Sequence, residues 1–426
     1  MTFDIITLGC KVNEYESQYY AGRLEELGLQ RDAENPDAII VNTCTVTNTA
    51  AAKSRQKISR ARRNHPQAVV AMVGCYAQSV DAKLQEELGI DVLVGASHKK
   101  ELPELIVQAL QDHQRISTVE DISHFDQFEA MPLSAFEEKH RAFLKVEDGC
   151  NQFCTYCQIP YVRGRERSLP AEQAVAIGQE LAEKGHLEIV LTGIHTGRYQ
   201  DGSLSLSGLL KELLQALPES VHFRISSIEI TEIDDELIEL LAHEPRLNPH
   251  LHIPIQSGAN ATLKRMNRPY TVEEFFERVD RIRQAVPHIS ISTDIMAGFV
   301  QESEAEFAET LQNIENSGFS FLHVFPYSKR DGTAAARMSG HLPGPVIRER
   351  THQLLALSEK LREADMKRFE TIEVLCEQEK EDGVHGYTAQ YHPVLLKKKP
   401  EKQRFVTGYD RIENGVYIVE EPEEKG

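Results

Sequence analysis

Short apolar runs alternate with amphipathic segments over the first 95 residues. The apolar runs have the length and composition of strands, and they cover Asp4–Leu8, Ala38–Val41, Ala68–Val73 and Val92–Val94. Helical patterns separate them over Tyr15–Leu27, Ala50–Arg63 and Asp81–Leu88. Strands that alternate with helices usually pair in parallel and carry the helices on their faces. The pattern therefore predicts an α/β domain with a parallel sheet.

A second alternating series begins at Phe143. Its expected strands are Phe143–Val146, Ile189–Thr192, His222–Ser226, Leu251–Ile255, Ile289–Asp294 and Phe321–Phe325. Helical patterns separate most of them, over Ala171–Lys184, Asp234–Leu241, Val272–Ala285 and Glu304–Ser317, and a long charged helix from Val346 to Phe369 follows. These units are fewer than a closed (β/α) barrel contains, so a partial, TIM-like (β/α)6 barrel is predicted.

The tail from Thr371 to Glu421 changes character. Short β-like segments there are broken by glycines and charged turns, which predicts a small antiparallel β-barrel of the oligonucleotide-binding type. The resulting domain boundaries are an N-terminal domain over residues 1–115, a linker over 116–139, a barrel domain over 140–368 and the small barrel over 369–426.

The composition of the chain indicates where in the cell the protein is expected and in which state its cysteines are. No apolar run approaches the length of about 18 residues that a membrane span needs, and no basic segment precedes the apolar stretch at the N-terminus. We therefore expect no membrane partner and a cytoplasmic location, where thiols stay reduced. The seven cysteines are then ligands, nucleophiles or core residues rather than a disulfide framework.

The net charge of −19 argues against a general polyanion-binding surface but leaves room for a local basic groove. Each basic stretch is read equally well as a solvated face or as a contact to nucleic acid. The stretches are Lys53 to Arg63, then Arg163, Arg165 and Arg167, and finally Lys397 to Lys399.

Cys150, Cys154 and Cys157 form a C-x3-C-x2-C motif directly after an expected strand. Zinc is the first alternative, but a structural zinc site needs four ligands, and the nearest histidines, His140 and His186, lie outside the loop. Three thiolates in a compact loop suit a [4Fe-4S] cluster that leaves one iron without a protein ligand. Such an iron can bind S-adenosylmethionine, and electron transfer from the cluster then cleaves that molecule to a radical.

Cys10, Cys44 and Cys75 are far apart in sequence, yet ITLGC, IVNTC and MVGC each place a cysteine at the end of an expected strand. Because the carboxyl ends of parallel strands share one edge of a sheet, we expect the three thiols to meet and to hold a second cluster. The alternative is three unrelated buried cysteines. Cys376 lies in the apolar run IEVLC and is assigned to the core.

Together with these cysteines, further motifs make the sequence resemble the radical S-adenosylmethionine methylthiotransferases over nearly its whole length. The shared motifs are RGRERS, LTGIHTG, HIPIQSGANATLKRMNR, STDIMAGF and HVFPYSKRDGTAAARM in the central part, and GYTAQYHPV in a tail that resembles an RNA-binding TRAM-like domain. LGCKVNEYES, NTCTVTNTA and LTGIHTG are most similar to the branch that acts on N6-threonylcarbamoyladenosine at position 37 of tRNA. Sibling branches modify isopentenyladenosine-37 or an aspartate of a ribosomal protein.

The resemblance implies a reaction with two [4Fe-4S] clusters and two uses of S-adenosylmethionine. One molecule would donate a methyl group to a sulfur at the site of Cys10, Cys44 and Cys75, and another would supply the radical that activates C2 of the adenine. An electron donor protein and the tRNA anticodon loop are the implied partners. A non-enzymatic iron–sulfur RNA sensor remains an alternative.

Further residues follow the strand ends of the expected barrel. Gly193, Ser226 and Gln256 would contact S-adenosylmethionine, although each position has an equally good structural explanation. His195 and Asp294 are polar strand-end residues without an assigned task. Arg163 and Arg165 follow the cysteine loop and are predicted to contact tRNA.

Two departures from the family pattern stand out. Phe299 is followed by VQES where the family usually has Pro-Gly-Glu-Thr, in a loop that the resemblance places near the nucleoside of S-adenosylmethionine. Leu169 stands where an arginine is usual, so one RNA contact is expected to be missing.

Overall fold

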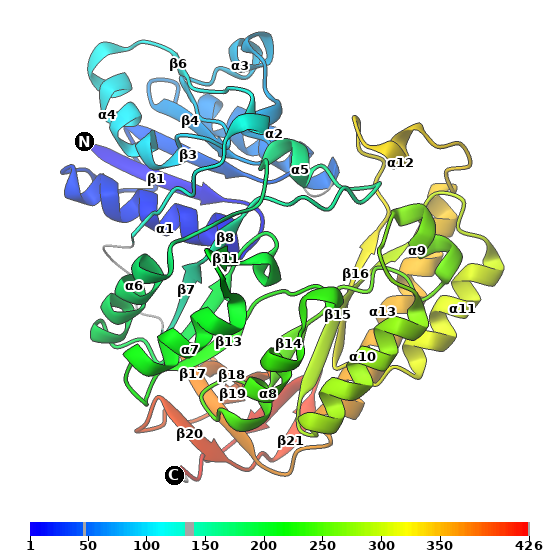
Figure 1. Ribbon diagram of the computed structural model, residues 1–426. Coiled ribbons are helices and arrows are strands. Elements are labelled where there is room, and N and C mark those ends of the chain that lie inside the picture. The colour runs from blue at the N-terminus through cyan, green and yellow to red at the C-terminus, as the bar shows by residue number, and fades with distance from the viewer. Residues whose placement is uncertain (46–47, 133–139, 425–426) are drawn as a thin grey trace.

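The structure is a computed structural model that describes residues 1–45, 48–132 and 140–424, and Figure 1 shows its three successive parts. A six-stranded sheet with helices comes first, two three-stranded sheets follow, and a second six-stranded sheet ends the chain. The α/β class predicted from the sequence is confirmed. None of the helices in these ranges has the length and hydrophobicity that crossing a bilayer requires.

The first sheet pairs its strands in the order β2-β1-β3-β4-β5-β6, and the neighbouring strands run parallel, as predicted. Successive residues of the central strands face opposite sides, so Ile40 packs toward α1 and α4, while Ile39 and Val41 pack toward α2 and α3. The strands are β1 (Thr2–Thr7), β2 (Gln30–Arg31), β3 (Ala38–Thr43), β4 (Val69–Gly74), β5 (Val92–Leu93) and β6 (Ile116–Ser117). The helices are α1 (Lys11–Glu26), α2 (Asn48–Asn64), α3 (Ala82–Leu88) and α4 (Leu102–Asp112).

The predicted linker over 116–139 begins too early. Ile116 and Ser117 pair with β5 and form the edge strand β6, because the chain returns to the sheet after α4. Residues 133–139 of that linker lie outside the described residues.

The central part is a partly curled sheet with helices outside it (Figure 1). Parallel strands pair as β7-β10-β13 and as β14-β15-β16, and a single bridge between Phe223 and Leu247 joins the two groups. One continuous hydrophobic core fills the space between the strands and the outer helices. The strands are β7 (Arg141–Lys145), β10 (Glu188–Thr192), β13 (His222–Ile225), β14 (His250–His252), β15 (Ser290–Ala297) and β16 (Phe321–Pro326). The larger helices are α6 (Ala171–Glu183), α7 (Leu206–Ala216), α8 (Asp235–His243), α10 (Val272–Ala285), α11 (Glu304–Glu315) and α13 (Gly344–Met366).

One predicted strand in this part is shorter than expected. Leu251–Ile255 was predicted, but β14 ends at His252. Pro254 cannot donate to a strand ladder, and Gln256 adopts a left-handed backbone conformation with φ of +68°. The chain therefore leaves the sheet early and forms an irregular turn at the mouth of the curled sheet.

The last sheet pairs its strands in the order β20-β17-β18-β19-β22-β21. Its pairs are antiparallel except that β19 and β22 run parallel, so the prediction of a purely antiparallel domain is wrong at this pair. Cys376 lies buried in the core of this sheet, as predicted. The strands are β17 (Ile372–Lys380), β18 (Gly383–Thr388), β19 (Pro393–Leu396), β20 (Arg404–Thr407), β21 (Arg411–Glu413) and β22 (Val416–Val419).

The last sheet docks directly on the curled sheet. Arg224 of β13 is buried and donates to the carbonyl oxygens of Ala389 and Thr388, at 2.9 and 3.3 Å. The same guanidinium lies 4.8 Å from the ring centroid of Tyr391. Tyr391 therefore enters the inner side of the curled sheet from the C-terminal part of the chain.

Candidate active site

The loop with Cys150, Cys154 and Cys157 surrounds its thiols with hydrogen-bond donors. The backbone N–H of Gln152 lies 3.3 Å from Cys150 Sγ, and that of Ile159 lies 3.4 Å from Cys157 Sγ. Burial raises the pKa of the Cys157 thiol to about 12. Donors that point at sulfur stabilise thiolates once a metal is bound, and this donor set therefore fits an iron–sulfur cluster.

Arginine adds positive charge to the same loop. Arg268, from the LKRMNR motif, lies 3.5 Å from Cys154 Sγ through Nη1 and is almost completely buried. Burial raises the pKa of the Cys154 thiol, and the Arg268 cation works against that rise. A buried cation beside a cysteine favours an anionic ligand set.

His195 is a functional neighbour that sequence reasoning left without a task. Its Nδ1 lies 3.5 Å from Cys150 Sγ and 2.8 Å from Glu166 Oε1, and its Nε2 lies 2.6 Å from Glu232 Oε1. The ligand atoms of Cys150, Glu166 and His195 all lie within 4.8 Å of one another. Because this group contains only one of the three loop thiols, it does not supply the four-ligand zinc site. The available signal was the position of His195 in GIHTG, directly after β10.

Cys10, Cys44 and Cys75 all follow strands of the first sheet, as predicted. Cys10 caps α1 after β1, Cys44 follows β3, and Cys75 follows β4. The thiols of Cys44 and Cys75 are buried, and Cys10 is exposed. Burial raises the pKa of Cys75, the Arg163 cation opposes the rise, and the nearby Cys10 thiol adds to it.

Glycine makes this close approach possible. Gly9 has φ of +121°, and a Cβ at this position would lie 3.1 Å from Cys44 Cβ. Gly74 has φ of +96°, and a Cβ there would lie 2.4 Å from the carbonyl oxygen of Thr43. A larger residue would therefore push neighbouring strand ends apart, which explains the glycine before the cysteine in both LGC and VGC.

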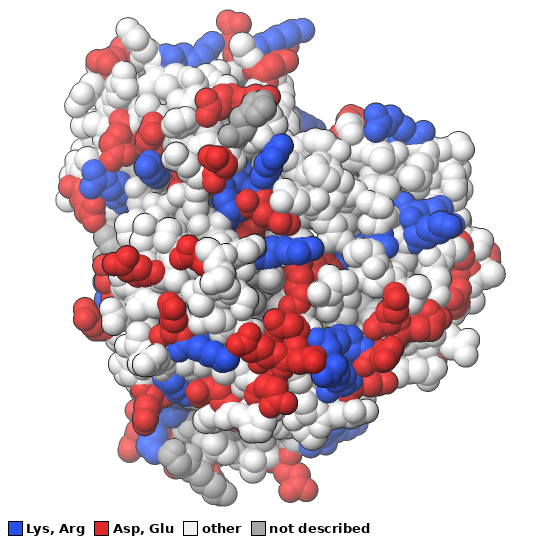
Figure 2. Space-filling model, viewed as in Figure 1, with Lys and Arg blue, Asp and Glu red and all other residues white. Residues whose placement is uncertain are grey.

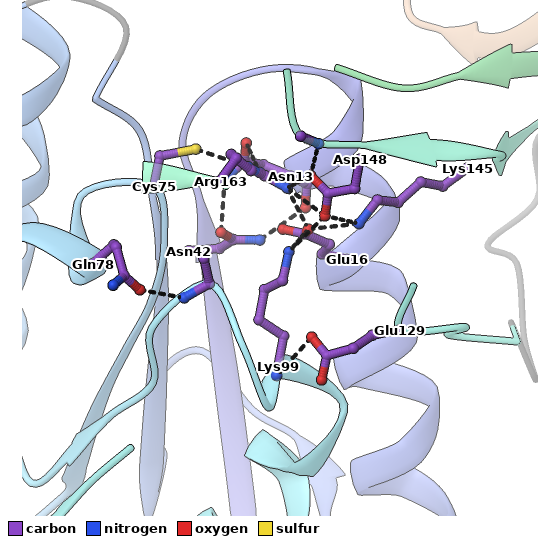
Figure 3. A network of polar contacts seen from close by, with 12 residues as sticks. Asn13, Glu16, Asn42, Cys75, Gln78, Lys99, Glu129, Lys145, Asp148 and Arg163 are labelled. Atoms are coloured by element: carbon purple, nitrogen blue, oxygen red, sulfur yellow. Dashed lines mark hydrogen bonds and ion pairs between the residues drawn. The ribbon is translucent and has the colours of Figure 1, made fainter. Parts of the chain in front are cut away.

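Arg163 does not contact solvent, so its predicted role in tRNA binding is wrong. It is only 1% exposed, and its Nε donates to Cys75 Sγ at 3.1 Å (Figure 3). Its Nη1 lies 2.8 Å from Glu16 Oε1 and 3.3 Å from Asp148 Oδ1. Arg163, which follows the loop of Cys150, Cys154 and Cys157 in sequence, thus connects that part of the chain to Cys75 of the first sheet.

A buried charge network surrounds Arg163 at the boundary between the first two parts of the chain (Figure 3). Lys99 Nζ lies 2.7 Å from Glu16 Oε1, and Lys145 Nζ lies 2.7 Å from Asp148 Oδ2. Burial alone would raise the pKa of Glu16, but the cations of Arg163, Lys99 and Lys145 hold it well below its usual range.

Positive charge is in excess in this network. Among the described residues, the buried cations are Lys99, Lys145, Arg163 and Arg167, the buried carboxylates in contact with them are Glu16 and Asp148, and the partly buried Glu129 accepts from the backbone N–H of Lys99. Unbalanced buried charge is costly, so the arrangement calls for an additional anion. Cys75, in direct contact with Arg163, marks where such an anion fits.

Arg330 connects the two cysteine sites. Its Nη2 donates to Thr45 Oγ1, next to Cys44, and to Gln158 Oε1, next to Cys157. Its Nη1 is buried and has no partner among the described residues. Burial lowers the pKa of Arg330, and the thiols of Cys44 and Cys157 both raise it. A buried guanidinium donor between the two cysteine sites fits an anionic group bound there.

Two cavities open beside these residues. A cavity of about 160 Å³ is lined by Cys157, Tyr156, Gln256 and Arg330, among others. Gln256, with its left-handed backbone, is the predicted S-adenosylmethionine contact that lies here. Strained backbone of this kind is common where a site fixes its ligand.

The second cavity, of about 820 Å³, occupies the inner side of the curled sheet. It is lined by Gly193 and Ser226, the other two predicted contacts, and also by Cys10. Asp294 and Phe325 line both cavities, so the two spaces are adjacent. The structure therefore brings the predicted residues to one region but divides them between two cavities.

The loop after Phe299 and the residue after RGRERS turn inward. Phe299 and Val300 are completely buried, and Glu302 pairs with Arg350 at 2.7 Å. Leu169 is 1% exposed and belongs to the core of the curled sheet. Leu169 therefore contributes to packing, and the expectation that one RNA contact is lost at this position stays a prediction.

The basic stretches differ in how much charge they expose. On α2, Ile58 and Ala61 face the sheet, whereas Lys53 and Arg60 face solvent. Of the three arginines after the cysteine loop, only Arg165 is exposed. Figure 2 shows one face of the molecule, where acidic side chains gather over α8 and basic ones around α12 (Ala334–Arg337).

Comparison with known proteins agrees with this fold. The family model of the Radical SAM superfamily matches residues 144–314, and that of the Uncharacterized protein family UPF0004 matches residues 2–95. The solved structure of the radical S-adenosylmethionine methyltransferase TsrM of Kitasatospora setae superposes with a TM-score of 0.55 at 16% identity, covering 77% of this chain and 74% of that one. The cobalamin-dependent enzyme OxsB gives a TM-score of 0.52 at 12% identity, covering 84% and 56%. Fold and cysteine loop together define a radical SAM protein.

Curated relatives narrow the class. The threonylcarbamoyladenosine tRNA methylthiotransferase MtaB of Bacillus subtilis is 42% identical, covering 92% of this chain and 89% of the relative. The Aquifex aeolicus protein of the same name is 37% identical, covering 84% and 88%. The tRNA-2-methylthio-N(6)-dimethylallyladenosine synthase of Staphylococcus aureus is 32% identical, covering 94% and 80%. The chain belongs to the family of radical SAM tRNA methylthiotransferases, and this class implies S-adenosylmethionine and a [4Fe-4S] cluster.

Proposed function

We propose that the protein installs a methylthio group at C2 of N6-threonylcarbamoyladenosine at position 37 of tRNA. The name of the Bacillus subtilis relative, which is similar over 92% of this chain, supports the choice of substrate. The main structural support for a methylthiolation reaction is the wall that the two cavities share. One cavity is lined by Cys157, the other by Cys10, and Asp294 and Phe325 belong to both. A substrate in the larger cavity therefore lies next to both cysteine sites.

Each cysteine site would hold one [4Fe-4S] cluster. Bound at Cys150, Cys154 and Cys157, the cluster with S-adenosylmethionine supplies a radical, while the second, at Cys10, Cys44 and Cys75, carries the sulfur that is transferred. The chain's own residues bind and orient these groups. Arg268 and Arg163 neutralise thiolate charge, and Gln256, Gly193 and Ser226 position S-adenosylmethionine and substrate at the strand ends.

RNA binding would use the outer parts of the chain. The exposed lysine and arginine side chains of α2 follow Cys44 and can contact phosphates next to the first sheet. The sheet over residues 369–426 is proposed as a TRAM-like RNA-binding domain, next to an N-terminal domain over 1–115 and a radical SAM domain over 140–368. Position 37 lies in the single-stranded anticodon loop, whose bases can be turned out into a cavity. A separate protein would donate the electrons.

The test is mass spectrometry of tRNA nucleosides from a deletion strain, with and without the gene restored. We expect the 2-methylthio derivative of threonylcarbamoyladenosine to disappear on deletion and to return on complementation. Loss of the methylthio derivative of isopentenyladenosine instead would assign the sibling activity, and unchanged tRNA with an altered ribosomal protein would assign the protein-modifying one. Anaerobic incubation with S-adenosylmethionine and a reductant separates these enzymes from a sensor, which would release no 5′-deoxyadenosine.

A further inference from the structure

The larger cavity contains a cation that the chemistry described so far does not use. Lys11 is the first residue of α1 and lines the cavity beside Cys10. Its ammonium nitrogen lies 5.1 Å from the ring centroid of Tyr391, which comes from the last sheet. Lys11 therefore reaches from the first part of the chain across the cavity to a residue of the third.

Two of the histidines that line the cavity with Lys11, His250 and His323, have lowered pKa values. Burial lowers the pKa of His323 to about 4 and that of His250 well below its usual value, and the Lys11 cation contributes to both shifts. The ring of His250 stands 5.1 Å from that of Tyr391, so this group forms the inner end of the cavity. Lys11 is thus the charged donor among neutral imidazoles at this end.

Other polar side chains that line the larger cavity are held in place by contacts with one another. His252 Nε2 lies 3.1 Å from Asp294 Oδ1, and its Nδ1 lies 2.9 Å from Ser292 Oγ. The carboxylates that line the cavity are Asp294, held by this histidine, and Glu14 on α1. Asp294 also borders the smaller cavity, whereas Glu14 lies one helical turn from Lys11 on α1.

We propose that Lys11 binds the carboxylate of the N6 substituent of the substrate adenosine. This inference rests on the proposed function, because a threonylcarbamoyl group carries a free carboxylate and a hydroxyl, whereas the dimethylallyl group of the sibling substrate is a pure hydrocarbon. An ionised carboxylate enters a closed cavity only if a charged partner compensates for lost hydration. An ammonium–carboxylate hydrogen bond supplies this compensation.

The shape of the cavity supports the same assignment. Its volume of about 820 Å³ accommodates a nucleoside with a branched substituent. The end beside Asp294 and Phe325 adjoins the smaller cavity, so C2 of the adenine lies there when the substituent points toward Lys11 and Tyr391. The hydroxyl group of Ser226 also lines this cavity and can pair with a polar atom of the substituent. Lys11 is in this view a specificity-determining residue.

The experiment compares three anticodon stem-loops on the anaerobically reconstituted enzyme. They carry N6-threonylcarbamoyladenosine, its neutral methyl ester, or unmodified adenosine at position 37, and the equilibrium dissociation constant of each is measured. We expect wild type to prefer the free acid over both neutral stem-loops by about ten- to hundredfold, the range of one charge-assisted hydrogen bond. Lys11→Met abolishes the preference, and Lys11→Arg retains most of it.

The controls separate this inference from loss of the site. Lys211→Met removes an exposed lysine of α7 and leaves the preference unchanged. Iron content and the visible spectrum of Lys11→Met report whether the neighbouring cysteine site is intact, and the ester comparison requires no variant. If wild type binds acid and ester equally, or Lys11→Met keeps the preference, the inference is wrong while tRNA analysis can still support the proposed function. Absence of methylthio product from wild type would instead remove the proposed function itself.

Discussion

The two cysteine sites are built in opposite ways. Cys150, Cys154 and Cys157 lie in one loop, where nearby backbone N–H groups point at their sulfurs. Cys10, Cys44 and Cys75 come together only because three parallel strands end at one edge, and the neighbouring donor to Cys75 is Arg163 from another part of the chain. The first site is a local structure, and the second depends on the tertiary fold.

Because of this difference, the two cysteine sites depend on different parts of the fold for their stability. The loop site is formed mainly by its own turn, with Arg268 and His195 beside it, and its cysteines are partly buried. The strand-end site needs correct packing of the sheet, two glycines and a buried charge network that includes Glu16 and Asp148. Substitutions far from any cysteine are therefore expected to damage the second site more than the first.

The largest expected effect separates the two sites by their chemistry. Cys154→Ala and Cys10→Ala should both abolish methylthiolation of tRNA, but only Cys154→Ala should abolish release of 5′-deoxyadenosine, because that site supplies the radical. Chromatography of both products after anaerobic turnover checks this. Cys376→Ala, in the core of the last sheet, serves as the control with both products retained. Equal loss of 5′-deoxyadenosine in both variants would contradict the division of roles.

The next effect tests the dependence of the strand-end site on buried charge. Glu16→Ala leaves two buried cations, Lys99 and Arg163, to share the single buried carboxylate of Asp148 among the described residues, so the first part of the chain should lose about 3–5 kcal/mol of stability. Amide hydrogen exchange of α1 and β3 measures the loss locally. Glu87→Ala removes an exposed carboxylate with a 3.8 Å ion pair and should change exchange by less than about 0.5 kcal/mol. Similar amide exchange in both variants would contradict the prediction that the buried charge network stabilises the first part of the chain.

A pH effect is expected on the side of the loop site. Burial raises the pKa of Glu147 to about 8 from its ordinary value of 4.5, so the folded protein keeps a proton that the unfolded chain releases. Stability from this group is complete below pH 4.5 and falls as pH rises to about 8, which amounts to about 2–3 kcal/mol between pH 6 and 8. Glu147→Gln should flatten this decline in thermal unfolding scans. Glu87→Gln should follow wild type, and a Glu147→Gln curve parallel to wild type would refute the assignment.

The smallest effect concerns the RNA-facing side chains beside each site. Lys53 and Arg60 extend from α2, next to the strand-end site, and Arg165 follows the loop site. Replacing each by alanine should reduce the slope of log affinity against log salt by about 0.7 for every phosphate that is no longer neutralised. The double α2 variant should therefore change the slope about twice as much as Arg165→Ala. Lys211→Ala is the control, and a slope unaltered in the α2 variant would remove α2 from the interface.

Much of the fold was accessible from periodicity because the strands are apolar and their helices are amphipathic. The predicted helix Val272–Ala285 agrees at both ends with α10, which begins with a capping box between Thr271 and Glu274. The strand ends before Cys44 and Cys75 were equally clear, since β3 and β4 are buried along their whole length. Short edge strands such as β6 carry too few residues to show a period.

Side-chain partners were not accessible in the same way. Arg163 stands in a basic stretch, and sequence alone cannot distinguish an arginine that faces solvent from one that pairs with Glu16, 147 positions away. His195 follows a strand end as many structural residues do, and only the fold brings it to Cys150. The predicted placement of Cys10, Cys44 and Cys75 at strand ends was confirmed, whereas the predicted exposure of Arg163, which depends on a distant partner, was not.

The position of Arg330 has a consequence for the order in which the molecule is made. Cys10, Cys44 and Cys75 leave the ribosome long before Arg163 and Arg330 have been synthesised, and N-terminal segments generally fold first. The strand-end thiols are then present without the cations that complete their surroundings, since Arg330 binds Thr45 from 285 positions further along the chain. We therefore expect this site to be completed only after residue 330 has been synthesised, because chains that stop before it lack the Arg330 contact to Thr45.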